Sequence, residues 1–313
     1  MIMSEGKMSL FDLKNELGFE VIWGNEYLNR TVSRAMTSRP GVELYSDYFN
    51  YYEYERIQII GSKELALFNM LENEDKIART EKLFSFNPPA FIFSKNVDAP
   101  KEFIQAAIKF RIPIFKSHFT TSILISNITA VLNEGLAERK SVHGVMLDVN
   151  GVGVIITGKS GIGKSETALE LIKRGHLLIA DDRVDIYQKE PGTIIGEAPK
   201  VTEKLMEIRG IGIVNVVDLF GVGSFRDKKR LMMVAEFVKW EDAKTTDRIG
   251  LRTETIKYFD TELPKITIPV QPGRNMTTLV EVAALNWRLK SMGINAAEAF
   301  AKRISELVEG GKK

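Results

Sequence analysis

Along the first 137 residues, short apolar runs alternate with segments in which apolar residues recur every three or four positions. The runs predict buried strands, which we expect at residues 57–60, 90–93 and 112–115. The helical spacing predicts helices at residues 63–71, from Pro100 through Ile108, and at residues 122–137. A capping box of Ser9 and Asp12 predicts a short first helix that stops near Gly18. This alternation favours an α/β domain with a largely parallel sheet.

The second half of the chain has a different pattern. Short strand patterns dominate from residue 142 to about residue 269, and one clear helix after Lys164 interrupts them. Two helices are expected to close the chain, one over residues 280–289 and a last one capped by Asn295 and Glu298 that reaches Leu307. The polar residues 138–141 are the best candidate for a linker. We therefore expect an α/β protein of two domains, residues 1–137 and residues 138–313.

Composition and charge exclude several classes of protein. The chain has 43 Lys and Arg against 41 Asp and Glu, a net charge of +2, so it has no electrostatic basis for dedicated binding to nucleic acid or a membrane surface. Cysteine is absent, which excludes disulfides, thiolate zinc sites and a cysteine nucleophile, and leaves a hard cation held by oxygens as the expected kind of metal. No apolar run approaches the length of a membrane span and the N-terminus lacks a signal-peptide core, so we expect a cytoplasmic protein.

The strongest motif is a phosphate-binding loop. Residues 158–165 fit the pattern of Gly, four residues, then Gly-Lys-Ser, between a strand pattern at 152–156 and a helix pattern at 165–174. Glycines let backbone N–H groups surround phosphate oxygens at a helix N-terminus. Lys164 should contact the β and γ phosphates of ATP, and the Ser165 hydroxyl should ligate Mg²⁺. The expected nucleotide-binding residues are Gly158, Lys159, Ser160, Gly161, Ile162, Gly163, Lys164 and Ser165.

Two carboxylates follow the next apolar strand pattern, at residues 177–180. Asp181 and Asp182 would then lie at the carboxyl edge of the sheet, beside the phosphates. One can serve the metal while the other accepts a proton from an attacking hydroxyl. The alternative is a pair of solvated loop acids with Arg183 as an ion-pair partner.

Several weaker features remain open from residue types alone. Glu207 could be a further Mg²⁺ ligand, or its segment could be a strand entered through a bulge. His143 is more often a structural residue than a catalytic one in such a position. The basic run at 226–230 is most simply a charged hairpin tip. Arg248 and Arg274 could each bind phosphate, since a guanidinium offers a planar fork of donors, or could lie in ordinary turns.

Taken together, these motifs resemble the HPr kinase/phosphorylase family, the bifunctional serine kinases of bacterial carbon-catabolite control. The resemblance is carried by ordered segments that span nearly the whole chain, namely 38–41, 56–61, 141–145, 163–171, 174–176, 180–184, 207–210, 212–213 and 272–275.

The resemblance implies roles for individual residues. His143, Lys164, Asp182 and Arg248 fall on the family's active-site positions, with Asp182 as the proton acceptor, and Ser165 and Glu207 fall on its Mg²⁺ positions. Residues 206–215 match the signature tied to both reactions, and residues 269–274 match the loop tied to dephosphorylation. Two departures stand out, Lys159 in place of an acidic residue and Val-Lys-Trp at 238–240 in place of Glu-Asn-Trp.

The resemblance also implies the activity and the assembly. The expected function is ATP-dependent phosphorylation of a serine on the phosphocarrier protein HPr, and phosphate-dependent dephosphorylation of phosphoserine-HPr that gives pyrophosphate. A homohexamer and a C-terminal P-loop domain similar to phosphoenolpyruvate carboxykinase are implied in the same way. Two other functions stay open: a small-molecule kinase or carboxykinase relative that shares the loop, and a nucleotide-gated regulatory scaffold without catalysis.

Overall fold

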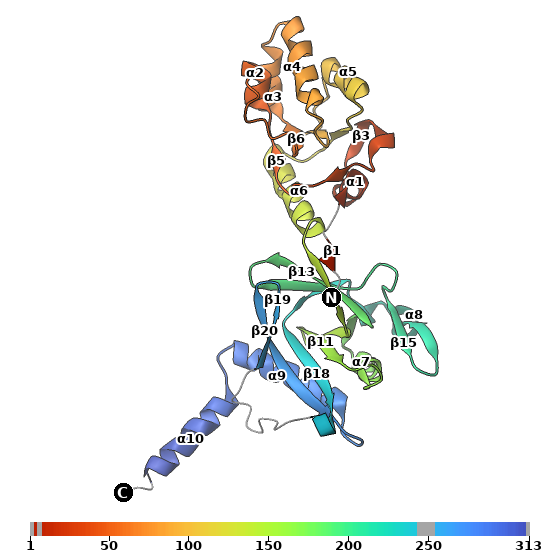
Figure 1. The fold of residues 1–313 in the computed structure, drawn as a ribbon, viewed down its shortest axis with the longest axis vertical. Coiled ribbons are helices and arrows are strands. Elements are labelled where there is room, and N and C mark those ends of the chain that lie inside the picture. Colours follow the sequence, from red (N-terminus) through yellow and green to blue (C-terminus); the bar gives the residue numbers. More distant parts are fainter. Residues whose placement is uncertain (1–2, 5–7, 243–253, 311–313) are drawn as a thin grey trace. The chain divides into compact units, whose positions relative to one another are not determined.

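The structure is a computed structural model that describes residues 3–4, 8–242 and 254–310. The chain forms two units, which we call the N-terminal unit (Glu5–Ala137) and the C-terminal unit (Glu138–Lys313 together with Met1–Ser4). Figure 1 shows both units as ribbons. The first four residues group with the C-terminal unit because β1 (Met3–Ser4) pairs with β9 (Arg139–His143).

A mostly parallel sheet forms the centre of the N-terminal unit. Its strands lie in the order β3-β8-β7-β6-β5, and β5 to β8 run parallel while β3 is antiparallel at one edge. This confirms the expected α/β class with a largely parallel sheet. The strands are β3 (Glu20–Trp23), β5 (Thr37–Ser38), β6 (Ile57–Ile60), β7 (Phe91–Phe93) and β8 (Ile114–Lys116).

Helices cover both faces of this sheet (Figure 1). Neighbouring side chains of one strand point to opposite faces, so Phe91 packs into one apolar cluster and Ile92 into the other. The first face carries α2 (Gly41–Ser46), α3 (Ser62–Asn69), α4 (Asn73–Ser85) and α5 (Lys101–Phe110). The second carries α1 (Leu10–Leu17) and α6 (Thr121–Gly135). A small ribbon of β2 (Met8–Ser9) and β4 (Thr31–Val32) and the 3₁₀ turn η1 (Asn25–Tyr27) complete the unit.

Ser9 caps the first helix as predicted, but the second bond between the two residues runs from the Ser9 hydroxyl to Asp12 Oδ2 at 2.7 Å and not from the Ser9 backbone N–H as in a capping box. The Ser9 side chain accepts a hydrogen bond from the Asp12 backbone N–H at 3.1 Å, and Gly18 ends α1 in the left-handed region at φ 66°. Ser9 therefore satisfies one of the N–H groups that a helix start leaves unpaired.

The C-terminal unit contains two larger sheets and a separate hairpin. A six-stranded sheet has the order β12-β10-β11-β18-β20-β19, and a five-stranded antiparallel sheet has the order β1-β9-β13-β14-β17. The first sheet consists of β10 (Val145–Val149), β11 (Val152–Gly158), β12 (Leu177–Ala180), β18 (Met233–Lys239), β19 (Glu254–Tyr258) and β20 (Thr261–Val270). The second adds β13 (Arg183–Glu190), β14 (Thr193–Glu197) and β17 (Lys228–Leu231), and the hairpin is β15 (Leu205–Ile208) with β16 (Gly212–Asn215).

Two apolar layers hold these elements together. Alternate residues of β10 point to opposite sides: Val145 and Leu147 pack toward α7 (Lys164–Lys173) and α9 (Met276–Ser291), whereas Met146 packs toward the second sheet. The remaining elements are α8 (Val216–Phe220), η2 (Val222–Ser224), η3 (Trp240–Asp242) and α10 (Ala296–Gly310). No helix in the described part of the chain is long and apolar enough to cross a bilayer.

Two expectations for the C-terminal half are wrong. The polar residues 138–141 are not a linker, because Arg139–His143 forms β9 between β1 and β13. The basic run is not a hairpin tip, because Lys228–Leu231 forms β17, which pairs with β14 at the edge of the sheet. Backbone hydrogen bonds hold both segments in sheets although few of their side chains are apolar. Charged residues are common on an edge strand such as β17.

Candidate active site

The topology of the six-stranded sheet brings distant segments to one edge. Strands β11 and β12 are both antiparallel to β10, which lies between them, so they run in the same direction. Strands β18 and β20 also run parallel to β11. The carboxyl ends of these four strands therefore share an edge, which is where ligands bind in open α/β sheets.

The phosphate-binding loop connects β11 to α7 as predicted. Gly161 and Gly163 have φ values of +77° and +100°, which glycine adopts without strain. A Cβ on Gly158 would lie 2.5 Å from the carbonyl oxygen of Phe237 on β18, so only glycine fits there. The ammonium of Lys164 donates to the carbonyls of Gly158 at 3.0 Å and Lys159 at 3.2 Å, which holds it inside the loop.

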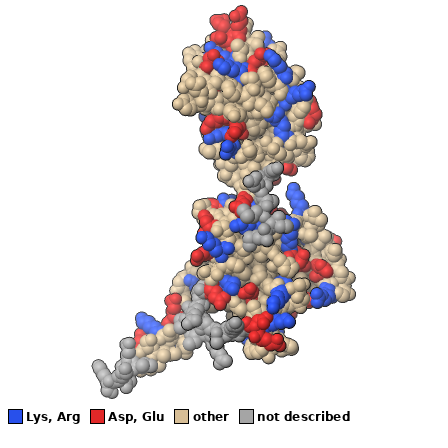
Figure 2. Space-filling model, in the orientation of Figure 1, with Lys and Arg blue, Asp and Glu red and all other residues tan. Residues whose placement is uncertain are grey.

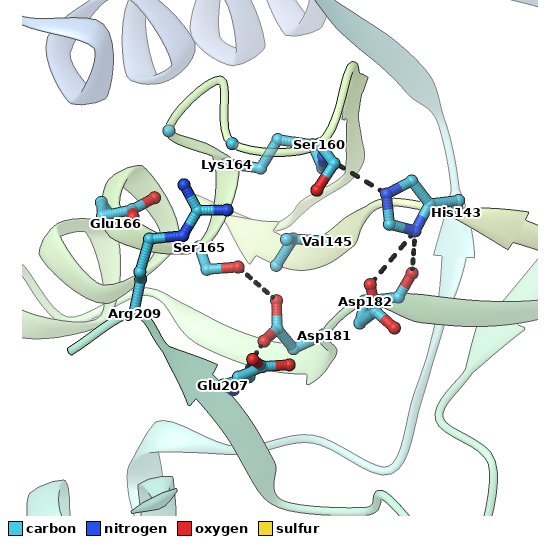
Figure 3. Close-up of a pocket in the computed structure, with 12 residues that line it drawn as sticks. His143, Val145, Ser160, Lys164, Ser165, Glu166, Asp181, Asp182, Glu207 and Arg209 are labelled. Atoms are coloured by element: carbon cyan, nitrogen blue, oxygen red, sulfur yellow. Dashed lines mark hydrogen bonds and ion pairs between the residues drawn. The ribbon is translucent and has the colours of Figure 1, made fainter. Parts of the chain in front are cut away.

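Asp181 joins three parts of the site (Figure 3). Its buried carboxylate accepts a hydrogen bond from Ser165 Oγ at 3.0 Å and another from the backbone N–H of Glu207 at 2.9 Å. Burial raises the pKa of the Asp181 carboxyl above its usual value, although these two hydrogen bonds act in the opposite direction. Asp181 thus ties the start of α7 to β15.

Asp182 points away from Asp181 and toward His143 (Figure 3). These two aspartates form the whole connection between β12 and β13, and Asp182 has a φ of +62°. Its side chain is 71% exposed, with Oδ1 3.2 Å from His143 Nδ1. The other ring nitrogen of His143 lies 3.5 Å from Lys164 Nζ. Arg183 pairs with Asp185 at 2.9 Å, so it is not the partner of either aspartate.

The β15–β16 hairpin supplies two charged groups to the same pocket. In β15, Met206 and Ile208 are buried in the core, so Glu207 between them faces the pocket, and Arg209, in the turn just after β15, also lines it (Figure 3). A Cβ on Gly161 would lie 3.1 Å from Arg209 Nη1, which places the guanidinium against the phosphate-binding loop. The register of the hairpin is continuous, so the alternative of a strand entered through a bulge is wrong.

The pocket contains two charged residues to which sequence reasoning assigns no definite role, Asp181 and Arg209. From residue types alone, the sequence does not say which of Asp181 and Asp182 serves the metal, and it gives no role to Arg209. The alternation of apolar and charged residues at 206–209 is the signal in the sequence that groups Arg209 with Glu207, although Arg209 lies just after β15.

Three further residues singled out in the sequence do not line this pocket in the described part of the chain: Arg274, Lys159 and Arg248. Arg274 is in the turn after β20, where its guanidinium stacks over the Trp240 ring at 5.7 Å from the ring centre and donates to the carbonyl of Pro269 at 3.4 Å. Lys159, the unusual loop residue, forms an exposed ion pair with Asp242 at 3.2 Å. Arg248 belongs to residues 243–253, outside the described part of the chain.

A strand, a glycine-rich loop and a helix, with paired carboxylates at the same sheet edge, define a P-loop protein equipped for phosphoryl transfer. The chain matches the HPr Serine kinase N terminus over residues 8–132 and the HPr Serine kinase C-terminal domain over residues 134–304. It belongs to the HPr serine kinase family.

Two curated relatives along nearly the whole chain agree with this assignment. The HPr kinase/phosphorylase of Bacillus subtilis (strain 168) is 46% identical over 307 residues, which cover 98% of this chain and 99% of the relative. That of Geobacillus kaustophilus is 46% identical over 305 residues, covering 97% and 98%. The solved structure of the Hpr(Ser) kinase/phosphatase from Coxiella burnetii is 36% identical and covers 51% of this chain and 98% of its own, with a TM-score of 0.47.

Proposed function

We propose that this protein transfers the γ-phosphoryl group of ATP to a serine of HPr, and that it removes the same group by phosphorolysis, giving pyrophosphate. The observation that carries the proposal is the exposed Asp182 carboxylate beside His143, whose other ring nitrogen faces the phosphate-loop lysine. The names of the two relatives state both a kinase and a phosphorylase activity.

Asp182 is the proposed proton acceptor. A serine hydroxyl is a poor nucleophile, so a base must take its proton as the phosphoryl group is transferred. A serine on the surface of a folded protein can approach the exposed carboxylate of Asp182, whereas the carboxylate of Asp181 is buried and already hydrogen-bonded on both oxygens. His143, 3.2 Å from Asp182, helps to hold the base in position.

The residues at the loop fit Mg²⁺. Mg²⁺ prefers oxygen ligands and is usually held by one or two protein groups together with phosphates and water. Ser165 and Glu207 provide a hydroxyl and a carboxylate, and Asp181 holds both segments together. The described residues include no group of three or more acidic or histidine side chains placed to hold a metal alone. When bound, Mg²⁺ neutralises charge on the phosphates.

The same residues can run the reverse reaction. An oxygen of inorganic phosphate attacks the phosphorus of phosphoserine, and the bond between phosphorus and the serine oxygen breaks. Asp182, now protonated, returns its proton to that oxygen, so the base of one direction is the acid of the other. Lys164, Arg248 and Arg274 are proposed to stabilise negative charge on the transferring group or on the incoming phosphate.

The proposed assembly is a homohexamer. The exposed apolar face of α10 supports association with other copies: Phe300, Ile304 and Leu307 recur at helical spacing and are 52%, 43% and 77% exposed. An amphipathic helix with such a face is stabilised when another surface covers it.

One assay tests this function. The protein is incubated with HPr, MgCl₂ and ATP, phosphoserine is measured by mass spectrometry, and excess inorganic phosphate is then added. We expect phosphoserine-HPr to form and then to disappear with release of pyrophosphate. EDTA and the Lys164→Met variant are the controls, and both should block the two steps.

Two outcomes would contradict the proposal. Phosphorylation of small metabolites without transfer to HPr would identify a small-molecule kinase. Tight ATP binding with unchanged nucleotide and unmodified HPr would identify a regulatory scaffold.

A further inference from the structure

Arg209 is a cationic side chain of the phosphate pocket to which the proposed function gives no role. It lies in the turn just after β15, and its guanidinium faces the phosphate-binding loop (Figure 3). A Cβ on Gly161 would lie 3.1 Å from Arg209 Nη1 and 3.4 Å from Arg209 Nη2, so both terminal nitrogens lie against the loop. The planar fork of the guanidinium therefore borders the space where such a loop holds phosphates.

The charge of Arg209 is not used by the protein itself. Four carboxylates line the same pocket, those of Glu166, Asp181, Asp182 and Glu207. Arg209 nevertheless has no ion-pair or hydrogen-bond partner in the part of the chain that the structure describes. Its five N–H donors are therefore available to a ligand of the pocket.

The two lysines of the loop contrast with Arg209. Lys164 donates to the carbonyls of Gly158 and Lys159, and Lys159 pairs with Asp242 at 3.2 Å. A guanidinium stays charged at neutral pH and binds a phosphate through two parallel hydrogen bonds. An arginine with a purely structural role would bond to a neighbouring protein group, so the unpaired guanidinium points to an anionic ligand.

The hairpin holds the backbone of Arg209 in place without using its side chain. Two positions earlier, the backbone N–H of Glu207 donates to the buried carboxylate of Asp181 at 2.9 Å. The preceding residue, Ile208, is buried in the core, and its carbonyl accepts a hydrogen bond from the Ile211 N–H at 3.0 Å. Such a fixed backbone lowers the entropy cost of binding a ligand.

The position of Arg209 selects one phosphate of the bound chain. Figure 3 shows Arg209 and His143 on opposite sides of the pocket, with Lys164 and Ser165 between them. Asp182, the proposed proton acceptor, lies on the His143 side, where the phosphoryl group is transferred. Arg209 therefore faces the phosphate next to the transferred group. In ATP this is the β-phosphate, and in phosphorolysis it is the inorganic phosphate that becomes half of pyrophosphate.

We propose that Arg209 binds the phosphate group that is not transferred, the β-phosphate of ATP in one direction and inorganic phosphate in the other. This role rests on the proposed function for the identity of the two reactions, but the binding of phosphate can be measured without HPr. In the forward direction, the bond between the γ-phosphorus and the bridging oxygen breaks and negative charge develops on the β-phosphate. A guanidinium at that phosphate stabilises the charge.

Arg209→Gln removes the charge, whereas Arg209→Lys keeps the charge and loses the planar fork. Calorimetric titration of the full chain with pyrophosphate and MgCl₂, and separately with ADP and MgCl₂, gives the two affinities. We expect Arg209→Gln to weaken both by about tenfold, the effect of one charge-assisted hydrogen bond, and Arg209→Lys to weaken them less. Arg230→Gln, at an exposed arginine of β17 outside the pocket, is the matched control and should bind both ligands as the wild type does.

Melting temperature and kinetics separate binding from structure. Ligand-free Arg209→Gln should melt with the wild type, because in the described part of the chain the side chain has no partner to lose. With phosphoserine-HPr as substrate, its KM for inorganic phosphate should rise by about tenfold.

The inference is overturned if Arg209→Gln binds both ligands as tightly as the wild type. It is also overturned if Arg209→Gln and Arg209→Lys lose affinity equally and both melt at a lower temperature, since the role would then be structural. If the wild type binds both ligands, Arg209→Gln binds them weakly and HPr is never phosphorylated, the role of Arg209 in phosphate binding stands and the proposed function is wrong.

Discussion

Two adjacent aspartates have different environments because of the backbone conformation of the second. Asp182 has a φ of +62°, a region that Asp tolerates better than most residues. Its carboxylate is exposed beside His143, while the carboxylate of Asp181 is buried against Ser165 and Glu207. Two identical side chains in consecutive positions therefore have different environments, one suited to proton transfer and one to positioning.

Asp182→Asn tests the proton-transfer role. An amide of the same size cannot accept the proton, so we expect both phosphorylation and phosphorolysis to fall by about 10²–10⁴-fold, the usual contribution of a general base. ATP affinity, measured by calorimetry, should change little because the phosphate-binding loop is untouched. Asp227→Asn, at an exposed carboxylate outside the pocket, serves as the control. A variant at Asp182 that keeps the full kinase rate would show that another group accepts the proton.

Arg274→Ala tests the arginine in the turn after β20. Inorganic phosphate is not attached to a nucleotide, so it depends more on nearby cations than the phosphates of ATP do. We expect phosphorolysis to lose about tenfold more activity than phosphorylation, as expected from one charge-assisted hydrogen bond. Initial rates in both directions provide the measurement, with Arg288→Ala on α9 as the control. Equal losses in the two directions would count against a specific role in phosphorolysis.

At the level of elements, the common direction of several strands brings the site residues to one edge of the sheet. The phosphate-binding loop, the two aspartates and the turn with Arg274 follow β11, β12 and β20, which all run the same way in one sheet. The strand β10 runs in the opposite direction between β11 and β12, so the residues just before it, including His143, reach the same edge. Pocket residues from His143 to Arg209, 66 positions apart in the chain, thus lie together.

Features of the fold and the site that depend on residues close together in the chain can be predicted from the sequence. Features that depend on contacts between distant segments cannot. The phosphate-binding loop and the cap at Ser9 depend on neighbouring residues, and the structure shows both. The link from Asp181 to Glu207 depends on the placement of a hairpin 26 residues away, which no local pattern encodes. The sequence does not predict strands β9 and β17, because hydrogen bonds to neighbouring strands hold them in the sheet and their own residues have no apolar strand pattern.

Ser9→Ala tests the contribution of the first helix cap. Removing the acceptor of the Asp12 N–H should lower the free energy of unfolding of the N-terminal unit by about 0.5–2 kcal/mol. Urea denaturation and hydrogen exchange of the α1 amides provide the measurement. Ser85→Ala is a suitable control, because the Ser85 hydroxyl donates to a carbonyl within α4 and caps no helix start. Unchanged α1 exchange in Ser9→Ala would show that packing alone holds this helix.

At the scale of the whole molecule, charge and exposed apolar surface are distributed differently. Basic and acidic side chains are interspersed over both units on the face shown in Figure 2, consistent with the net charge of +2. Large apolar side chains are exposed at many places in both units, and on α10 three of them, Phe300, Ile304 and Leu307, recur along one side of the helix. Contacts between copies are therefore expected to depend more on apolar burial than on charge.

Ile304→Asp tests whether α10 contributes to assembly. A charge in the middle of the apolar face should lower the oligomer mass measured by light scattering, because burying an unpaired carboxylate is costly. Lys302→Asp places the same side chain on another face of the helix and should leave the mass unchanged. Retention of the full mass by Ile304→Asp would exclude this face from the subunit interface.

The pairing of β1 with β9 has a practical consequence for dissecting the protein. The chain leaves the C-terminal unit after Ser4 and returns at Glu138, so two connections join the units rather than one. A C-terminal fragment that starts at Glu138 would lack β1 and present β9 as an open edge, a template for pairing with other chains and for aggregation. Reattaching the first residues through a short glycine-rich bridge would close that edge, and would be the rational way to obtain the C-terminal unit alone.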